Sequence, residues 1–171
     1  MIRTLVFLSA IGLNCLNAQA CGDASKQRVQ SVLKESIRLN EAFKKSVDGS
    51  DDAKYKTLRR QVERYEESVA IPCLKRAVVL LTQMPDKSLL SDLFAHALSH
   101  ENSADEIESE VLATAMVQGP NLFFATWRHS STEIQKAVTA RVESGWNILK
   151  KKYSSDKQKR IEERLKEMQS K

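Results

Sequence analysis

SKQRVQSVLKESIRLNEAFKKSV, residues 25–47, is the stretch whose spacing decides the fold class. Its apolar side chains recur every three or four positions, which places them on one face of an α-helix. They are Val29, Val32, Leu33, Ile37, Phe43 and Val47, with Asn40 at the same spacing. The stretch therefore predicts a long amphipathic helix.

The residues that follow predict a second helix beside the first. The segment VDGSDD, residues 47–52, ends the first helix, because Gly49 is free to turn and Ser50 or Asp51 can accept hydrogen bonds from exposed backbone donors. The helical spacing then resumes at Tyr55, Leu58, Val62, Tyr65 and Val69. Two long helices joined by so short a connection are expected to form an antiparallel hairpin.

The middle of the chain predicts shorter and more apolar helices over residues 72–83, 88–99, 104–118 and 121–128, then a longer helix from Thr132. Pro72 and Pro120 stand where a first helical turn tolerates a missing backbone donor. The turns MPDKSLL at Met84 and GPNLFF at Gly119 begin thirty-five residues apart, close to the period of helical-hairpin repeats. This region resembles the HEAT-type solenoids, and the resemblance implies a stack of helices that binds other proteins along its concave side.

We therefore expect an all-α fold. An N-terminal helical hairpin leads into a stack of short helices, either an α-solenoid of the HEAT type or an irregular bundle, and a basic C-terminal helix follows. Five glycines and three prolines in 171 residues are too few for a fold of strands joined by tight turns.

The first twenty residues are typical of a signal peptide. Arg3 supplies a positive end, residues 5–16 are largely apolar, and Ala18-Gln19-Ala20 offers a cleavage site. The apolar run is shorter than the ~20 residues that a membrane span needs. We expect residues 1–20 to be removed, leaving a periplasmic or secreted protein in which residues 21–149 form one helical domain.

Export determines how the cysteines are interpreted. Cys15 lies in the apolar run that cleavage discards, so Cys21 and Cys73 remain. Two cysteines outside the cytosol are expected to form a disulfide, and only one pairing exists. The alternative is a lipid anchor on Cys21, as in bacterial lipoproteins, although Ala18 stands where such signals usually have leucine.

Residues 150–171 contain nine Lys or Arg and four Asp or Glu, an excess that equals the formal charge of the whole chain, +5. We expect a basic, charged C-terminal helix or tail. Nucleic acid is not expected as a partner, because the protein is exported and Tyr153 is the one aromatic residue in this segment that could stack on bases. Weak contact of the tail with an anionic membrane surface fits the compartment better.

His96 and His100 in HALSHE are the strongest candidates for metal ligands. At a spacing of four they share one helix face, and Glu101 or Asp105 could supply a third ligand for zinc. The zinc-protease motif, however, needs glutamate where this chain has Ala97. The alternative is that His96 is packed in the core and His100 lies at the helix C-terminus, where a cation suits the dipole. The leading expectation is that the protein binds no metal and no other cofactor.

No catalytic motif is visible in the sequence. It lacks a Gly-x-Ser-x-Gly elbow, a phosphate-binding glycine loop and a cysteine next to a base. Glu66 and Glu67 are paired carboxylates on a charged helix face, where we expect both to be solvated. The protein is therefore not expected to be an enzyme.

Core packing is expected for Trp127, because large aromatic side chains are mostly buried. Contact of Trp127 and Arg128 with a partner is the alternative, because Trp and Arg are enriched where binding energy concentrates. The expected function is a non-catalytic exported module that binds another protein, of the inhibitor or immunity type. The alternatives are a metal-binding or hydrolytic protein that uses His96, His100 and a nearby carboxylate, and an envelope lipoprotein anchored through Cys21.

Overall fold

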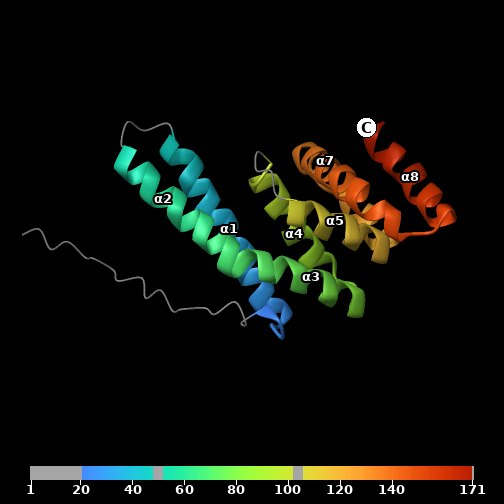
Figure 1. Ribbon diagram of the computed structural model, residues 1–171, viewed down its shortest axis with the longest axis horizontal. Helices are drawn as coiled ribbons and strands as arrows, with labels where there is room; N and C mark the ends of the chain where they lie inside the picture. The colour runs from blue at the N-terminus through green and yellow to red at the C-terminus, as the bar shows by residue number, and fades with distance from the viewer. Residues whose placement is uncertain (1–20, 48–51, 102–105, 171) are drawn as a thin grey trace, which may run out of the picture.

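A computed structural model describes residues 21–47, 52–101 and 106–170, and all regular structure within them is helical (Figure 1). The predicted all-α fold class is confirmed. The predicted signal peptide, the turn around Gly49 and the residues just after Glu101 lie outside the described residues.

Helices α1 (Lys26–Val47) and α2 (Asp52–Tyr65) lie side by side (Figure 1). The predicted spacing explains why α1 packs, since Val29, Val32 and Leu33 are buried on its inner face. Near the far end of the pair, the rings of Phe43 and Tyr55 lie 5.2 Å apart.

The chain stays helical from α2 through to α3 (Ile71–Gln83), where the sequence predicted a new helix beginning at Pro72. The two are joined by the π-helical turn η2 (Glu66–Ala70), in which the Ile71 N–H donates to the carbonyl oxygen of Glu66, five residues earlier. Pro72 cannot donate a backbone hydrogen bond, and its ring crowds the preceding turn. A wider π turn just before the proline accommodates it without ending the helix.

The core is built around α5 (Glu106–Gln118), which packs against α3, α6 (Pro120–Arg128) and α7 (Thr132–Leu149). Helix α4 (Lys87–Ser99) contacts α1 and α7. α5 and α7 approach so closely at Gly145 that a Cβ there would overlap the backbone of Ser109.

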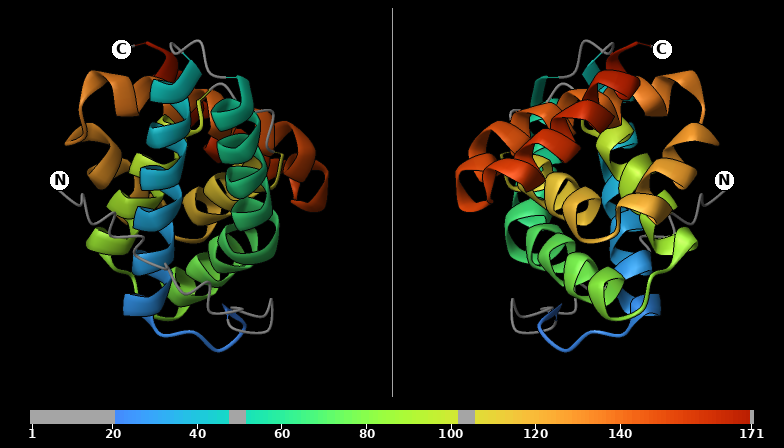
Figure 2. Two further views of the ribbon diagram at one scale, coloured as in Figure 1. Left: turned by 90° about the vertical axis from the view of Figure 1, so that its left-hand side faces the viewer. Right: turned by 90° about the vertical axis from the view of Figure 1, so that its right-hand side faces the viewer.

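The basic C-terminal segment folds onto the bundle. After the short 3-10 turn η3 (Lys150–Lys152), α8 (Ser155–Gln169) packs on α7 (Figure 2). Its apolar stripe of Ile161, Leu165 and Met168 is buried, while its charged residues face outward. Within the described residues, no helix combines the length and apolar character needed to cross a membrane.

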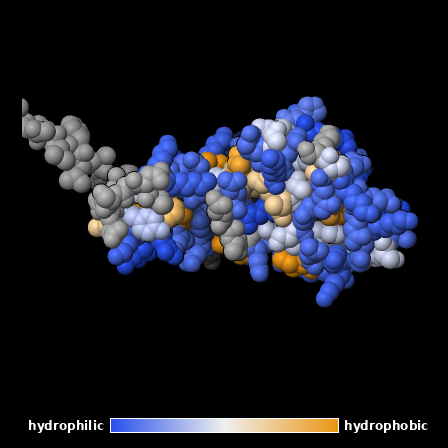
Figure 3. Space-filling view, turned by 90° about the horizontal axis from the view of Figure 1, so that it is seen from above, coloured by the Kyte–Doolittle hydropathy of each residue, from blue (hydrophilic) through white to orange (hydrophobic). Residues whose placement is uncertain are grey.

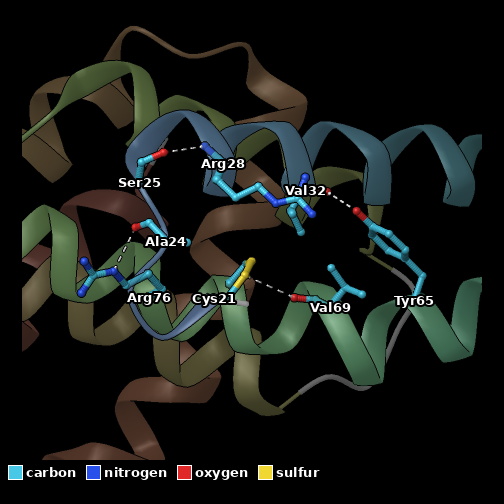
Figure 4. Close-up of a disulfide and its surroundings, with 9 residues drawn as sticks. Cys21, Ala24, Ser25, Arg28, Val32, Tyr65, Val69 and Arg76 are labelled. Carbon is cyan, nitrogen blue, oxygen red and sulfur yellow. Dashed lines mark hydrogen bonds between the residues drawn. A yellow bond between two sulfur atoms is a disulfide. The ribbon is translucent and has the colours of Figure 1, made fainter. Parts of the chain in front are cut away.

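The predicted disulfide is confirmed between Cys21 and Cys73, whose Cα atoms lie 5.1 Å apart (Figure 4). Both cysteines are buried. Next to the bond, Arg76 donates from Nε to the carbonyl oxygen of Ala24 at 3.2 Å. The segment that precedes α1 is therefore held against α3 by one covalent bond and one hydrogen bond.

Candidate metal centre

The two histidines of α4 stack at the C-terminal end of the helix. Their ring centroids lie 4.2 Å apart and the ring planes differ by 15°. Asp86 caps the start of α4 by accepting a hydrogen bond from the Leu89 N–H, and the helix then places His96 in its last turn and His100 at its C-cap. The spacing of four residues thus produces the shared face that the sequence predicted.

Each imidazole ring is oriented by a hydrogen bond at Nδ1. His96 Nδ1 lies 2.5 Å from Glu108 Oε1, and His100 Nδ1 lies 3.1 Å from the carbonyl oxygen of His96. An ionised carboxylate and a carbonyl can only accept, so both Nδ1 atoms donate. The Nε2 atom of each ring therefore faces the Glu66 carboxylate.

Glu66 supplies a carboxylate between the two rings. Its Oε1 lies 3.3 Å from His100 Nε2, and its Oε2 lies 3.8 Å from His96 Nε2. The three potential ligand atoms all lie within 4.8 Å of one another. Glu66 is the first residue of η2, and such π turns are frequently found at functional sites.

Helix α1 contributes two buried polar residues to the surroundings of the cluster. The Ser36 hydroxyl donates to Glu66 Oε1 and lies 2.9 Å from His96 Nε2. Asn40 donates from Nδ2 to the carbonyl oxygen of Ser99, at 2.5 Å, and so satisfies an acceptor at the end of α4. The core-facing spacing of Asn40 in the sequence therefore reflects a buried hydrogen bond.

An ion pair supports the histidines from α5 and α7. Arg141 Nε lies 3.4 Å from Glu108 Oε2, and Arg141 also donates from Nη2 to the carbonyl oxygen of His100 at 2.5 Å. Both side chains are buried. Because an uncompensated buried charge costs several kcal/mol, the guanidinium makes it possible to keep the Glu108 carboxylate in the core.

The surroundings of Glu66 and His100 favour opposite charges on them. Burial alone would raise the pKa of Glu66, but hydrogen bonds from His100 and Ser36 and the charge of His96 outweigh it and lower the pKa. Burial also opposes a charge on His100, yet the hydrogen bond and charge of Glu66 and the charge of Glu108 raise its pKa. The lowered pKa favours the ionised form of Glu66, as a metal ligand must be, whereas a metal ion has to displace the proton that the raised pKa favours on His100.

The carboxylate in the cluster differs from the one that the sequence suggested. Glu101 is exposed and is not a member of the cluster, and Asp105 lies outside the described residues. Glu67 is exposed as expected, whereas the expectation that Glu66 is solvated is wrong, since only 16% of its side chain is exposed. No local pattern marks Glu66, because its partners lie thirty or more residues away.

The two candidate partner-binding residues lie in different environments. Trp127 is 1% exposed and donates from Nε1 to the carbonyl oxygen of Gln135, so its side chain packs in the core and is not presented to a partner. Arg128 is exposed and forms an ion pair of 3.0 Å with Glu167 of α8. A large aromatic ring is stabilised more by burial than by a free surface position.

Two imidazoles and one carboxylate form a donor set that proteins use for zinc and for non-haem iron. Here the donors converge from α4 and η2, and hydrogen bonds to Glu108 and to the α4 backbone orient both rings. No family model, curated protein or solved structure matches this chain.

Proposed function

We propose that this protein binds one divalent transition-metal ion of the zinc class through His96, His100 and Glu66. The observation that carries the proposal is the convergence of their three donor atoms within 4.8 Å. Both Nδ1 atoms are already held by hydrogen bonds, which leaves both Nε2 atoms for an ion. Because the ring planes differ by only 15°, binding one ion requires one ring to tilt toward the other.

The distances suit a zinc ion. Two ligands that are each about 2.0–2.1 Å from zinc lie about 3.3 Å apart at the tetrahedral angle. Glu66 Oε1 and His100 Nε2 meet this spacing at 3.3 Å, whereas the 3.8 Å contact with His96 Nε2 is made by the other carboxylate oxygen, Oε2. The donors must therefore move inward to bind one ion. Imidazole nitrogens favour zinc, iron, nickel or copper over calcium and magnesium, which prefer all-oxygen sites.

Ser36 lies at the fourth corner of the site. Its hydroxyl contacts the same atoms of Glu66 and His96 that would bind the ion. In the metal-free protein Ser36 bridges the two ligands: its one proton is donated to Glu66, so toward His96 its oxygen can only accept. In the metal-bound protein the Ser36 oxygen or a water molecule completes the four ligands that zinc prefers.

The burial of the three ligands favours a structural role for the ion over a hydrolytic one. Ser36 and His96 are sealed from solvent, and the most exposed ligand, Glu66, keeps 16% of its side-chain surface. A hydrolytic zinc site keeps one position open to substrate. We propose that the ion stabilises the junction of α1, η2 and α4, and the absence of catalysis stays a prediction.

Metal analysis of tag-free mature protein tests the proposal. The protein is reconstituted with zinc, dialysed and analysed by inductively coupled plasma mass spectrometry, with one zinc per chain as the expected result. Zinc should also raise the melting temperature, because an ion that binds only the folded state stabilises it.

Glu66→Gln is the matched perturbation, because it removes the charge and keeps the side-chain volume. We expect it to weaken zinc binding by roughly ten-fold or more. Glu67→Gln removes the same charge from the neighbouring exposed residue and should leave the affinity unchanged. A zinc content near zero after reconstitution, or equal affinities for Glu66→Gln and wild type, would overturn the proposal.

We also propose that the mature protein is exported, to the periplasm or outside the cell. The disulfide supports this proposal, since such bonds persist in oxidising compartments. A Cys21 sulfur bonded to Cys73 has no valence left for a lipid. Intact-mass measurement of protein from the native host distinguishes the two: loss of two hydrogens indicates the disulfide, and an acyl increment indicates the lipoprotein.

Binding to another protein, as an inhibitor or immunity-type module, stays a prediction, and so does the HEAT-like arrangement. The side-by-side placement of α1 and α2 supports the hairpin, whereas the packing of α4 on both α1 and α7 favours the irregular bundle. Repeated pull-downs from envelope extract test the interaction, and failure to recover any stable partner would count against it.

A further inference from the structure

A cleft lies at the corner where α8 meets the end of α5 and the start of α6, on elements that carry none of the three proposed metal ligands. Its volume is about 520 Å³, within the range of sites for small organic ligands. This corner belongs to the α8 end of the molecule in Figure 1, and that end is largely hydrophilic in Figure 3.

The lining of the cleft is strongly basic. Lys157, Arg160 and Arg164 line it from one face of α8, at spacings of three and four residues, and Asp156 is the one acidic residue among the lining residues. Among the described residues, no ion pair holds any of these three cations, in contrast to Arg128 with Glu167. The lining residues therefore carry three positive charges and one negative charge.

Aromatic rings hold two of these cations in place. The guanidinium of Arg164 lies 5.0 Å from the ring centroid of Phe124, and Lys157 Nζ lies 4.7 Å from that of Tyr153. Stacking on a ring restricts a cation without using its N–H donors, which stay available for a ligand.

A helix N-terminus adds to the positive potential of the cleft. α6 begins at Pro120, which lines the cleft, and no side chain caps this end of the helix. The N-terminus of a helix carries a partial positive charge, which favours an anion, although Pro120 itself has no N–H to donate.

We propose that this cleft binds a small ligand through a phosphate group. The planar donor forks of Arg160 and Arg164 match the geometry of phosphate oxygens, and Lys157 adds a compact positive charge. Two kinds of ligand carry such a phosphate group: a soluble phosphate ester and the headgroup of an anionic phospholipid.

Two binding experiments on the mature full-length protein distinguish these sources. Glycerol 3-phosphate is titrated by calorimetry, with tryptophan fluorescence as a second readout, since Trp146 stacks on Tyr153 at 5.8 Å beside Lys157. Separately, the protein is sedimented with vesicles of phosphatidylcholine, with and without phosphatidylglycerol. Saturable binding of the ester identifies a soluble ligand, and binding only to the phosphatidylglycerol vesicles identifies the headgroup.

Substitutions on α8 decide whether binding occurs in the cleft. Arg160→Gln and Arg164→Gln should each weaken binding by roughly ten-fold, the effect expected for a charged hydrogen bond. Lys159→Gln removes the same charge from an exposed position of α8 that does not line the cleft, and should change binding less than about two-fold by comparison. Arg160 is exposed, and within the part of the chain that the structure describes no aromatic ring lies against its guanidinium, so its replacement should not affect folding.

Binding in either experiment that depends on Arg160 and Arg164 but not on Lys159 supports the proposal. Binding in neither experiment overturns it. An equal loss in Lys159→Gln also overturns it, because the attraction would then be a general effect of net charge.

Discussion

Replacing Gly145 by alanine perturbs the close approach of α5 and α7. A Cβ at this position would overlap the carbonyl group of Ser109 and lie 2.9 Å from the backbone nitrogen of Glu110. These are backbone atoms of a helix that is also packed against α3 and α6, so no side-chain rotation can relieve the overlap. The two helices must separate.

The expected loss of stability follows from two opposing effects. Alanine is favoured over glycine inside a helix by about 1 kcal/mol. Overpacking a well-packed core costs typically 1–3 kcal/mol, and we expect the upper end here because the obstructing atoms are backbone. The net loss in the free energy of unfolding is then about 2 kcal/mol, a fall in melting temperature of roughly 4–8 °C for a domain of this size.

Thermal unfolding followed by circular dichroism measures the change, with Gly119→Ala as the matched control. At Gly119 the nearest atom to an added Cβ is the carbonyl oxygen of Ala115, at 3.8 Å, which is ordinary contact. The control should melt within about 2 °C of wild type. The reasoning is refuted if Gly145→Ala melts at or above the wild-type temperature.

The same substitution links packing to the proposed metal site. Ser109 is the neighbour of Glu108, which orients the ring of His96. Separation of α5 from α7 should therefore move Glu108 and weaken zinc binding by roughly ten-fold, whereas Gly119→Ala should leave zinc binding unchanged. A destabilised Gly145→Ala protein with wild-type zinc affinity would contradict the orienting role of Glu108.

Three further perturbations test the fold in denaturant or thermal unfolding. Cys73→Ser opens a loop with a sequence separation of 52 residues, which should lower the free energy of unfolding by about 4 kcal/mol; a loss below about 1 kcal/mol would show that the disulfide adds little. Arg141→Leu leaves the buried Glu108 carboxylate without its ion pair and should cost about 3–5 kcal/mol, and an unchanged melting temperature would disprove that compensation. Asp86→Ala removes the cap of α4 and should cost about 1 kcal/mol at neutral pH. Hydrogen bonds from Lys26 and the backbone hold the pKa of Asp86 below its usual range, so its contribution is present above the pKa of the unfolded state and is lost as the pH falls through the folded-state pKa. The stability difference between wild type and Asp86→Ala should therefore shrink on acidification, and a difference that persists in strong acid would contradict this account.

The candidate site was only partly predictable from the sequence. His96 and His100 could be paired because four residues along one helix always bring side chains to the same face. Glu66 could not be chosen over Glu101, because its position depends on how α2 and η2 pack on α1 and α4. Ser36 looks like an ordinary polar helix residue in the sequence, and only the packing shows that it is buried against Glu66 and His96.

Local information in the chain was sufficient for the helical class, for most helix boundaries and for the cysteine pairing. Helical periodicity and capping act within a few residues, and two cysteines allow one connection. Long-range packing decided the rest: the burial of Glu66 and Ser36 beside His96 and the docking of α8 on α7. The physical reason is that burial and ionic contacts depend on which surfaces meet in three dimensions, and spacing along the chain does not specify that.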